Sequence, residues 1–113
     1  MTSPKINFSP KGLFIGGKWV DSYKGGRFST INPSNGQHLG EVPLAEKEDV
    51  NRAVIAAKQA FQDWGKMPLK ERAGFLIKLA DKLFENRDEL GMMDCVDSGN
   101  ALNGMKGDVD WSS

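Results

Sequence analysis

The chain has 113 residues, the length of one small domain. Its 15 basic and 15 acidic side chains give a formal net charge of +0, which argues against a nucleic-acid-binding protein held by phosphate contacts. Hydrophobic residues make up 39% and charged residues 27%, as in ordinary globular proteins. The single cysteine excludes an intramolecular disulfide and a cysteine-based zinc site. Because no secretory signal or membrane-spanning stretch is found, we expect a cytoplasmic protein that does not enter a membrane.

The first part of the chain predicts short strands joined by turns. Residues 1–12 are rich in proline and serine and are expected to form a flexible tail. The dipeptide Gly16-Gly17 predicts a tight hairpin turn, because such turns need positive φ angles. A second turn is expected at 33–36, where proline is followed by an Asn-Gly pair. Four strands are expected around these turns: 13–15, 18–20, 28–32 and 37–44.

From residue 46 the apolar residues recur at helical spacing. Gly65 and Pro68 are expected to end the first helix, before which we find no Ser, Thr, Asp or Asn cap. Asn86 and Glu89 predict a capping box for the third helix. The last helical pattern reaches the end of the chain without a terminating signal, so we expect a truncated helix. Three to four helices are expected: 46–64, 69–84, one from the cap at 86 to about 95, and the opening of a fourth at 101–111.

Taken by residue type, few side chains point to catalysis. His38 has no acid, thiol or second histidine at ligand spacing, so we expect an exposed or half-packed strand residue. Cys95 lies among methionines and a valine and is expected to be a small buried hydrophobe. A group of aspartates near the C-terminus could ligate a hard cation, although helix caps and surface charge are the simpler interpretation. These are Asp94, Asp97, Asp108 and Asp110.

Five sequence motifs, in this order and spacing, resemble the NAD(P)-dependent aldehyde dehydrogenase family. The resemblance covers nearly everything from Leu13 to Trp111. One departure is Asn100-Ala101, which stands where the family usually has Lys-Pro, outside the catalytic centre. The other is length, since the family's chains are several times longer. The motifs are LFIGGKWVDS at 13–22, FSTINPSNG at 28–36, EDVNRAV with the following AA and AF at 48–61, the Trp64 and Glu71-Arg72 helix, and DEL with DSG at 88–99.

The resemblance implies an α/β fold. The hairpins and three to four helices of residues 13–113 would form the N-terminal portion of a Rossmann-like cofactor-binding domain. The chain would be an N-terminal fragment of an oxidoreductase that converts an aldehyde to a carboxylic acid with NAD(P)+. The family's catalytic Cys, Glu and Asn lie beyond residue 113, so no catalytic or cofactor-binding residue is expected here and the isolated chain is expected to be inactive. The aldehyde substrate and any homo-oligomer would belong to the full-length protein.

One site of the family carries over in part. Many members bind a monovalent cation through a backbone carbonyl that matches Thr30 or Ile31 and a carboxylate that matches Asp108. Two other interpretations of the chain stay open. The chain could be a non-catalytic binding or regulatory module that docks onto full-length subunits. Its amphipathic helices at 50–64 and 69–83 would then supply the apolar contact face. The chain could also fold poorly alone and have no function.

Overall fold

The computed structural model describes residues 12–112. The predicted flexible tail at 1–12 therefore lies outside the described residues, apart from Gly12. The described chain divides into two compact units. Residues 12–30 and 40–72 form what we call the hairpin unit, and residues 31–39 and 73–112 form the helical unit. Each unit is described by itself.

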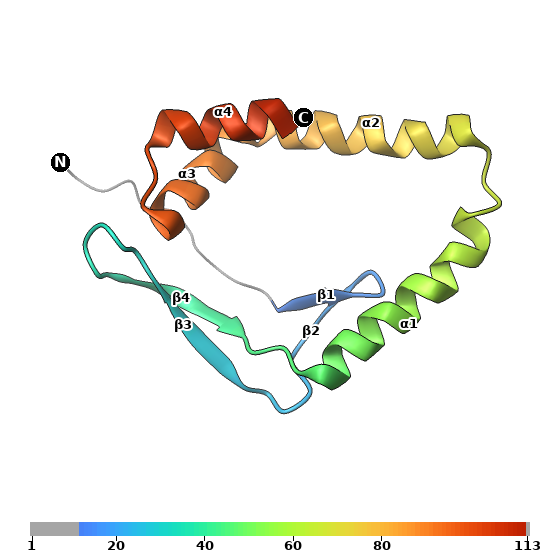
Figure 1. Ribbon diagram of the computed structural model, residues 1–113, viewed down its shortest axis with the longest axis horizontal. Coiled ribbons are helices and arrows are strands. Elements are labelled where there is room, and N and C mark those ends of the chain that lie inside the picture. The colour runs from blue at the N-terminus through green and yellow to red at the C-terminus, as the bar shows by residue number, and fades with distance from the viewer. Residues whose placement is uncertain (1–11, 113) are drawn as a thin grey trace. The chain divides into compact units, whose positions relative to one another are not determined.

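The hairpin unit begins with two short antiparallel strands, β1 (Leu13–Ile15) and β2 (Lys18–Val20), as predicted (Figure 1). Leu13 lies opposite Val20 and Ile15 opposite Lys18 in the ladder. The connecting Gly16 and Gly17 have φ angles of +60° and +79°. Two successive positive φ angles define the type I′ turn, whose twist matches that of the flanking strands. The prediction from the Gly-Gly pair is confirmed.

A second hairpin consists of β3 (Arg27–Ile31) and β4 (His38–Pro43). Each strand is one residue shorter at its turn-facing end than predicted. The reason is that Asn32 belongs to the turn: its side-chain Oδ1 accepts a hydrogen bond from the Ser34 N–H at 2.9 Å, and its own N–H donates to the Gln37 carbonyl at 2.8 Å. Asn side chains stabilise turns through such local bonds to the backbone.

Two long helices follow, α1 (Lys47–Trp64) and α2 (Leu69–Glu85). The predicted break between them is confirmed, with Gly65 at the end of α1 and Pro68 before α2. The Pro68 carbonyl accepts hydrogen bonds from the N–H groups of Glu71 and Arg72, so it opens the hydrogen-bond ladder of α2. Proline suits this position because the first N–H groups of a helix have no partner within it.

The helical unit contains α3 (Arg87–Ser98) and α4 (Leu102–Ser112), which pack closely against each other (Figure 1). The two helices lie close together at Gly91, where a Cβ would lie 2.7 Å from the Lys106 Cγ and 3.0 Å from its Cα. Only glycine allows the two backbones to come so near. Val109 of α4 is the one buried large apolar side chain among residues 12–112, at 8% exposure.

The predictions for the ends of α3 are wrong in two respects. Asn86 does not cap α3 through its side chain, whose Nδ2 donates to the Lys82 carbonyl at the end of α2 instead. The predicted capping box with Glu89 is therefore absent. The helix also continues to Ser98 rather than about Cys95, because the residue that can leave helical geometry is Gly99, with φ of +76°.

The overall class is α/β, as expected, with two small hairpins and four helices among the described residues. The expected range was three to four helices. Within residues 12–112 no helix has both the length and the apolar character needed to cross a bilayer.

Candidate functional site

The residues expected at a cation site lie on two elements. Thr30 and Ile31 are the last residues of β3, and Asp108 lies in the second half of α4. Thr30 belongs to the hairpin unit, whereas Ile31 and Asp108 belong to the helical unit. Ile31 and Asp108 are both exposed. Within the described residues, no group of three or more His, Cys, Asp or Glu side chains could hold a metal ion. Any cation here would therefore need backbone carbonyl ligands.

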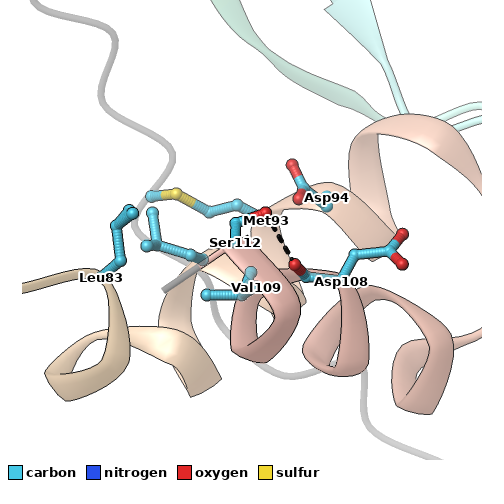
Figure 2. Close-up of a pocket in the computed structure, with 7 residues that line it drawn as sticks. Leu83, Met93, Asp94, Asp108, Val109 and Ser112 are labelled. Atoms are coloured by element: carbon cyan, nitrogen blue, oxygen red, sulfur yellow. Dashed lines mark hydrogen bonds between the residues drawn. The ribbon is translucent and has the colours of Figure 1, made fainter. Parts of the chain in front are cut away.

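Asp108 borders a hollow of about 290 Å³ in the helical unit (Figure 2). Its floor is apolar and comes from three helices: Leu83 of α2, Leu90 and Met93 of α3, and Val109 of α4. The Ser112 hydroxyl is used locally, because it donates to the backbone carbonyl of Asp108 at 2.8 Å. The size of the hollow is near the lower limit of about 300 Å³ for small-molecule pockets.

The polar edge of this hollow consists of Asp94 and Asp108, which Figure 2 shows beside each other. Among residues 12–112, neither carboxylate has a hydrogen bond or an ion pair. The nearby basic residues are paired elsewhere: Lys106 lies 3.3 Å from Asp88, and Arg87 lies 3.5 Å from Asp110. Of the four C-terminal aspartates, these two therefore keep their charge available at one edge of an apolar surface.

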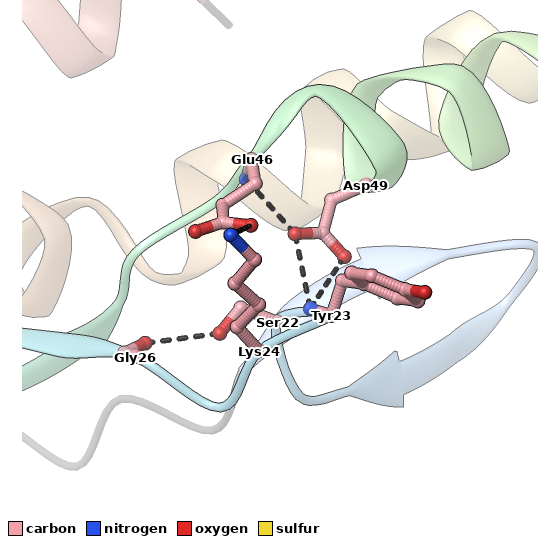
Figure 3. A network of polar contacts seen from close by, with 6 residues as sticks. All are labelled: Ser22, Tyr23, Lys24, Gly26, Glu46 and Asp49. Atoms are coloured by element: carbon pink, nitrogen blue, oxygen red, sulfur yellow. Dashed lines mark hydrogen bonds and ion pairs between the residues drawn. The ribbon is translucent and has the colours of Figure 1, made fainter.

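The most extensive polar network of the hairpin unit centres on Asp49 (Figure 3). This residue is only 2% exposed. Its Oδ1 and Oδ2 accept the Tyr23 N–H at 2.9 and 3.1 Å, and Oδ2 also accepts the Glu46 N–H at 2.9 Å. The carboxylate thus joins the loop after β2 to the first turn of α1. We name this arrangement the Asp49 latch.

Two further contacts close the same loop. The buried Ser22 hydroxyl donates to the Gly26 carbonyl at 2.9 Å, and the Lys24 ammonium lies 3.7 Å from the Glu46 carboxylate (Figure 3). The lysine is 71% exposed, so its ion pair contributes little. The Asp49 latch is a structural device, since all its partners are backbone groups of the same unit.

Sequence reasoning missed this latch. From the sequence, Asp49 is an acidic residue in the first turn of a helix, where it favours the positive end of the helix dipole, and nothing more is indicated. The N-cap position of α1 holds Glu46, which is not one of the usual capping residues. A carboxylate three positions into a helix can reach back to the N-cap N–H, as in a capping box, and that spacing was the available signal. Its second partner, Tyr23, lies 26 positions earlier and left no local signal.

The remaining candidate residues carry no catalytic arrangement. His38 is exposed on β4, as expected. Cys95 is half-buried in α3 and its thiol is free, so it is less buried than the expected small buried hydrophobe. Neither glycine pair precedes a helix: Gly16-Gly17 forms the β1–β2 turn, and Gly25-Gly26 lies before β3. Phosphate cradles need backbone N–H groups at a helix N-terminus, so these loops do not fit a dinucleotide.

Comparison with known proteins gives a consistent match. The model of the aldehyde dehydrogenase family matches residues 19–112. A malonate-semialdehyde dehydrogenase from Halalkalibacterium halodurans is 41% identical over 96 residues, which are 85% of this chain and 20% of that protein.

Two solved structures share the backbone arrangement. HpcC from Thermus thermophilus matches with a TM-score of 0.88 and 32% identity, over 93% of this chain and 20% of the other. A double mutant of betaine aldehyde dehydrogenase from Staphylococcus aureus, in complex with NAD+, matches with a TM-score of 0.84 and 31% identity. That match covers 88% of this chain and 20% of the other. The chain therefore spans about one fifth of the length of these relatives.

Proposed function

Because the chain belongs to the aldehyde dehydrogenase family, we propose that residues 13–113 serve as the N-terminal portion of the cofactor-binding domain of such an enzyme. The observation that carries the proposal is the combined match of sequence and backbone. The family model covers residues 19–112, and 93% of the chain superposes on a solved relative with a TM-score of 0.88. The intact enzyme would oxidise an aldehyde to a carboxylic acid with NAD(P)+.

The substrate and cofactor classes are supported by the relatives. One is a malonate-semialdehyde dehydrogenase, and another is a betaine aldehyde dehydrogenase in complex with NAD+. Both names place an aldehyde at the reacting centre. The nicotinamide cofactor supplies a hydride acceptor when it is bound. A cytoplasmic location, which fits the free Cys95 thiol, and a homo-oligomer of the full-length protein complete the proposal.

In this proposal the chain contributes structure rather than reacting groups. The described residues contain no thiol, acid and histidine gathered into one cluster, and the glycine pairs form no phosphate cradle. The 113-residue chain alone is therefore expected to be inactive. The Asp49 latch and the α3–α4 packing hold its elements in the conformation that the family shares.

A monovalent cation site is part of the proposal for the intact enzyme. The backbone carbonyl of Thr30 or Ile31 and the Asp108 carboxylate would be its ligands from this chain. The support from the structure is that the Asp108 carboxylate has no other partner among the described residues. A hard cation prefers such oxygen ligands. Replacing Asp108 by Asn in an intact enzyme should abolish any stabilisation by added K+ or Na+.

A chimera tests the proposed function. The 96 matched residues of the Halalkalibacterium halodurans enzyme are exchanged for the matching residues of this chain, in one continuous polypeptide. We expect aldehyde-dependent NADH formation by the chimera and none by the isolated 113-residue chain. Clear turnover by the isolated chain, or a folded chimera that binds NAD+ without any turnover, would contradict the proposal.

A further inference from the structure

The sequence contains two Asn-Gly pairs, Asn35-Gly36 and Asn103-Gly104. Asparagine is chemically labile when glycine follows it, because the glycine nitrogen can attack the side-chain carbonyl carbon without a Cβ in its way. All four residues are exposed, and both pairs belong to the helical unit. The two pairs are therefore alike in sequence and in exposure, and they differ in backbone conformation.

The first pair lies in the turn between β3 and β4. The Gln37 N–H donates to the Asn35 Oδ1 at 2.9 Å, which polarises the side-chain carbonyl and makes its carbon a better electrophile. The Gly36 N–H donates to the Asn32 carbonyl at 2.8 Å, so the attacking nitrogen is released when the turn opens. Exposed turns held by local hydrogen bonds open at the low end of the range of free energies within a protein.

The second pair lies in the first turn of α4. The Met105 N–H donates to the Ala101 carbonyl at 3.1 Å, so the helical ladder spans the pair. Attack on the Asn103 side chain needs a rotation about the Cα–C bond that takes the residue out of helical geometry. That rotation would unwind the start of α4, which packs against α3 where Lys106 meets Gly91. The helix therefore protects an asparagine that the sequence marks as labile.

We propose that Asn35 is a site of spontaneous deamidation in the folded chain and that α4 protects Asn103 from the same reaction. The Gly36 nitrogen loses its proton and forms a bond to the Asn35 Cγ. The bond from Cγ to the side-chain nitrogen breaks, so ammonia leaves and a cyclic succinimide remains. Water then opens the ring at either carbonyl, which gives aspartate or isoaspartate. The reaction needs water alone as co-reactant.

The modification changes the turn and its contact with α3. Either product adds a negative charge to a chain whose formal net charge is +0. Isoaspartate also routes the main chain through the former side chain, which lengthens the backbone before Gly36 and disrupts the hydrogen bond from the Gln37 N–H. The same turn lies against the end of α3, where a Cβ on Gly99 would be 2.9 Å from the Pro33 Cγ. Deamidation therefore weakens the contact between the turn and α3.

Incubation of the 113-residue chain in neutral and in mildly alkaline buffer, followed by trypsin digestion and mass spectrometry, tests the proposal. Cleavage after Lys and Arg places the two pairs in separate peptides, residues 28–47 and 88–106. We expect conversion of amide to acid at Asn35 to be at least about tenfold faster than at Asn103. Alkaline buffer should accelerate it, because the attacking nitrogen must lose its proton. An unincubated sample corrects for deamidation during digestion.

Two controls separate the effect of the fold from that of the sequence. In guanidinium chloride the helix is lost, and both pairs should deamidate at similar rates. Asn35→Gln should abolish the reaction in its peptide, because the longer side chain closes a ring less readily. The other asparagine of that peptide, Asn32, precedes Pro33, whose nitrogen has no proton to lose.

Three results would overturn the proposal. The two pairs could deamidate at equal rates in native buffer. Asn35 could stay unmodified in native buffer while the denatured chain reacts. The mass gain in the first peptide could also persist in Asn35→Gln, which would place the reaction at another residue.

Discussion

Removal of the Asp49 latch is the most informative perturbation of the structure. Asp49→Ala deletes the acceptor of two backbone N–H groups, those of Tyr23 and Glu46, at 2.9 to 3.1 Å. When a buried N–H group loses its charged acceptor, the free energy of unfolding falls by about 1–3 kcal/mol. Both contacts are only part-buried, so we take about 1.5 kcal/mol for each donor, or about 3 kcal/mol in total.

Urea unfolding of the 113-residue chain, followed by far-UV circular dichroism, measures this loss. With a slope of about 1.5 kcal/mol per M, the midpoint should fall by about 2 M. Asp49→Asn keeps one carbonyl acceptor and should lose about half as much. The neighbouring Glu48→Ala serves as control, because Glu48 is about half exposed and its ion pair, with Arg52 at 3.6 Å, lies at the surface. A midpoint for Asp49→Ala equal to that of Glu48→Ala would refute the latch.

Two further predictions concern glycines of the helical unit. Gly99→Ala should lower the free energy of unfolding by about 1–2 kcal/mol, because φ is +76° and the new Cβ would lie 2.9 Å from the Pro33 Cγ. Thermal unfolding would measure this loss of stability. An unchanged midpoint would contradict the left-handed conformation of Gly99 at the end of α3. Gly91→Ala should cost about 1–3 kcal/mol, because its Cβ would meet the Lys106 backbone at 3.0 Å. Gly104→Ala, which meets nothing within 4 Å, is the control, and equal stability of the two variants would contradict the close packing of α3 and α4.

Features set by neighbouring residues were predictable from the sequence. The β1–β2 turn depends only on the φ angles that Gly16 and Gly17 can adopt, and the helices depend on apolar spacing within one segment. Asn86 shows the limit of such local signals. The same amide can cap the helix after it or bond to the helix before it, and the structure uses the second option.

The candidate site was harder to predict from the sequence than the fold. Asp49 bonds to Tyr23 across 26 positions, and no local pattern reports such a contact. The sequence indicates Asp108 as one of four C-terminal aspartates, and only the resemblance to a family that uses a carboxylate there distinguishes it from the other three. Its position beside Asp94 at the edge of an apolar hollow depends on how α3 and α4 pack, which periodicity alone does not determine.

The central claim is that this chain supplies the family's N-terminal structure to an aldehyde dehydrogenase. The rate of aldehyde-dependent NADH formation by the chimera with the Halalkalibacterium halodurans enzyme tests it most directly. We predict a rate within about tenfold of the parent enzyme, which corresponds to about 1.4 kcal/mol in the activation free energy. A soluble chimera with the parent's helix content and no detectable NADH formation would contradict the claim.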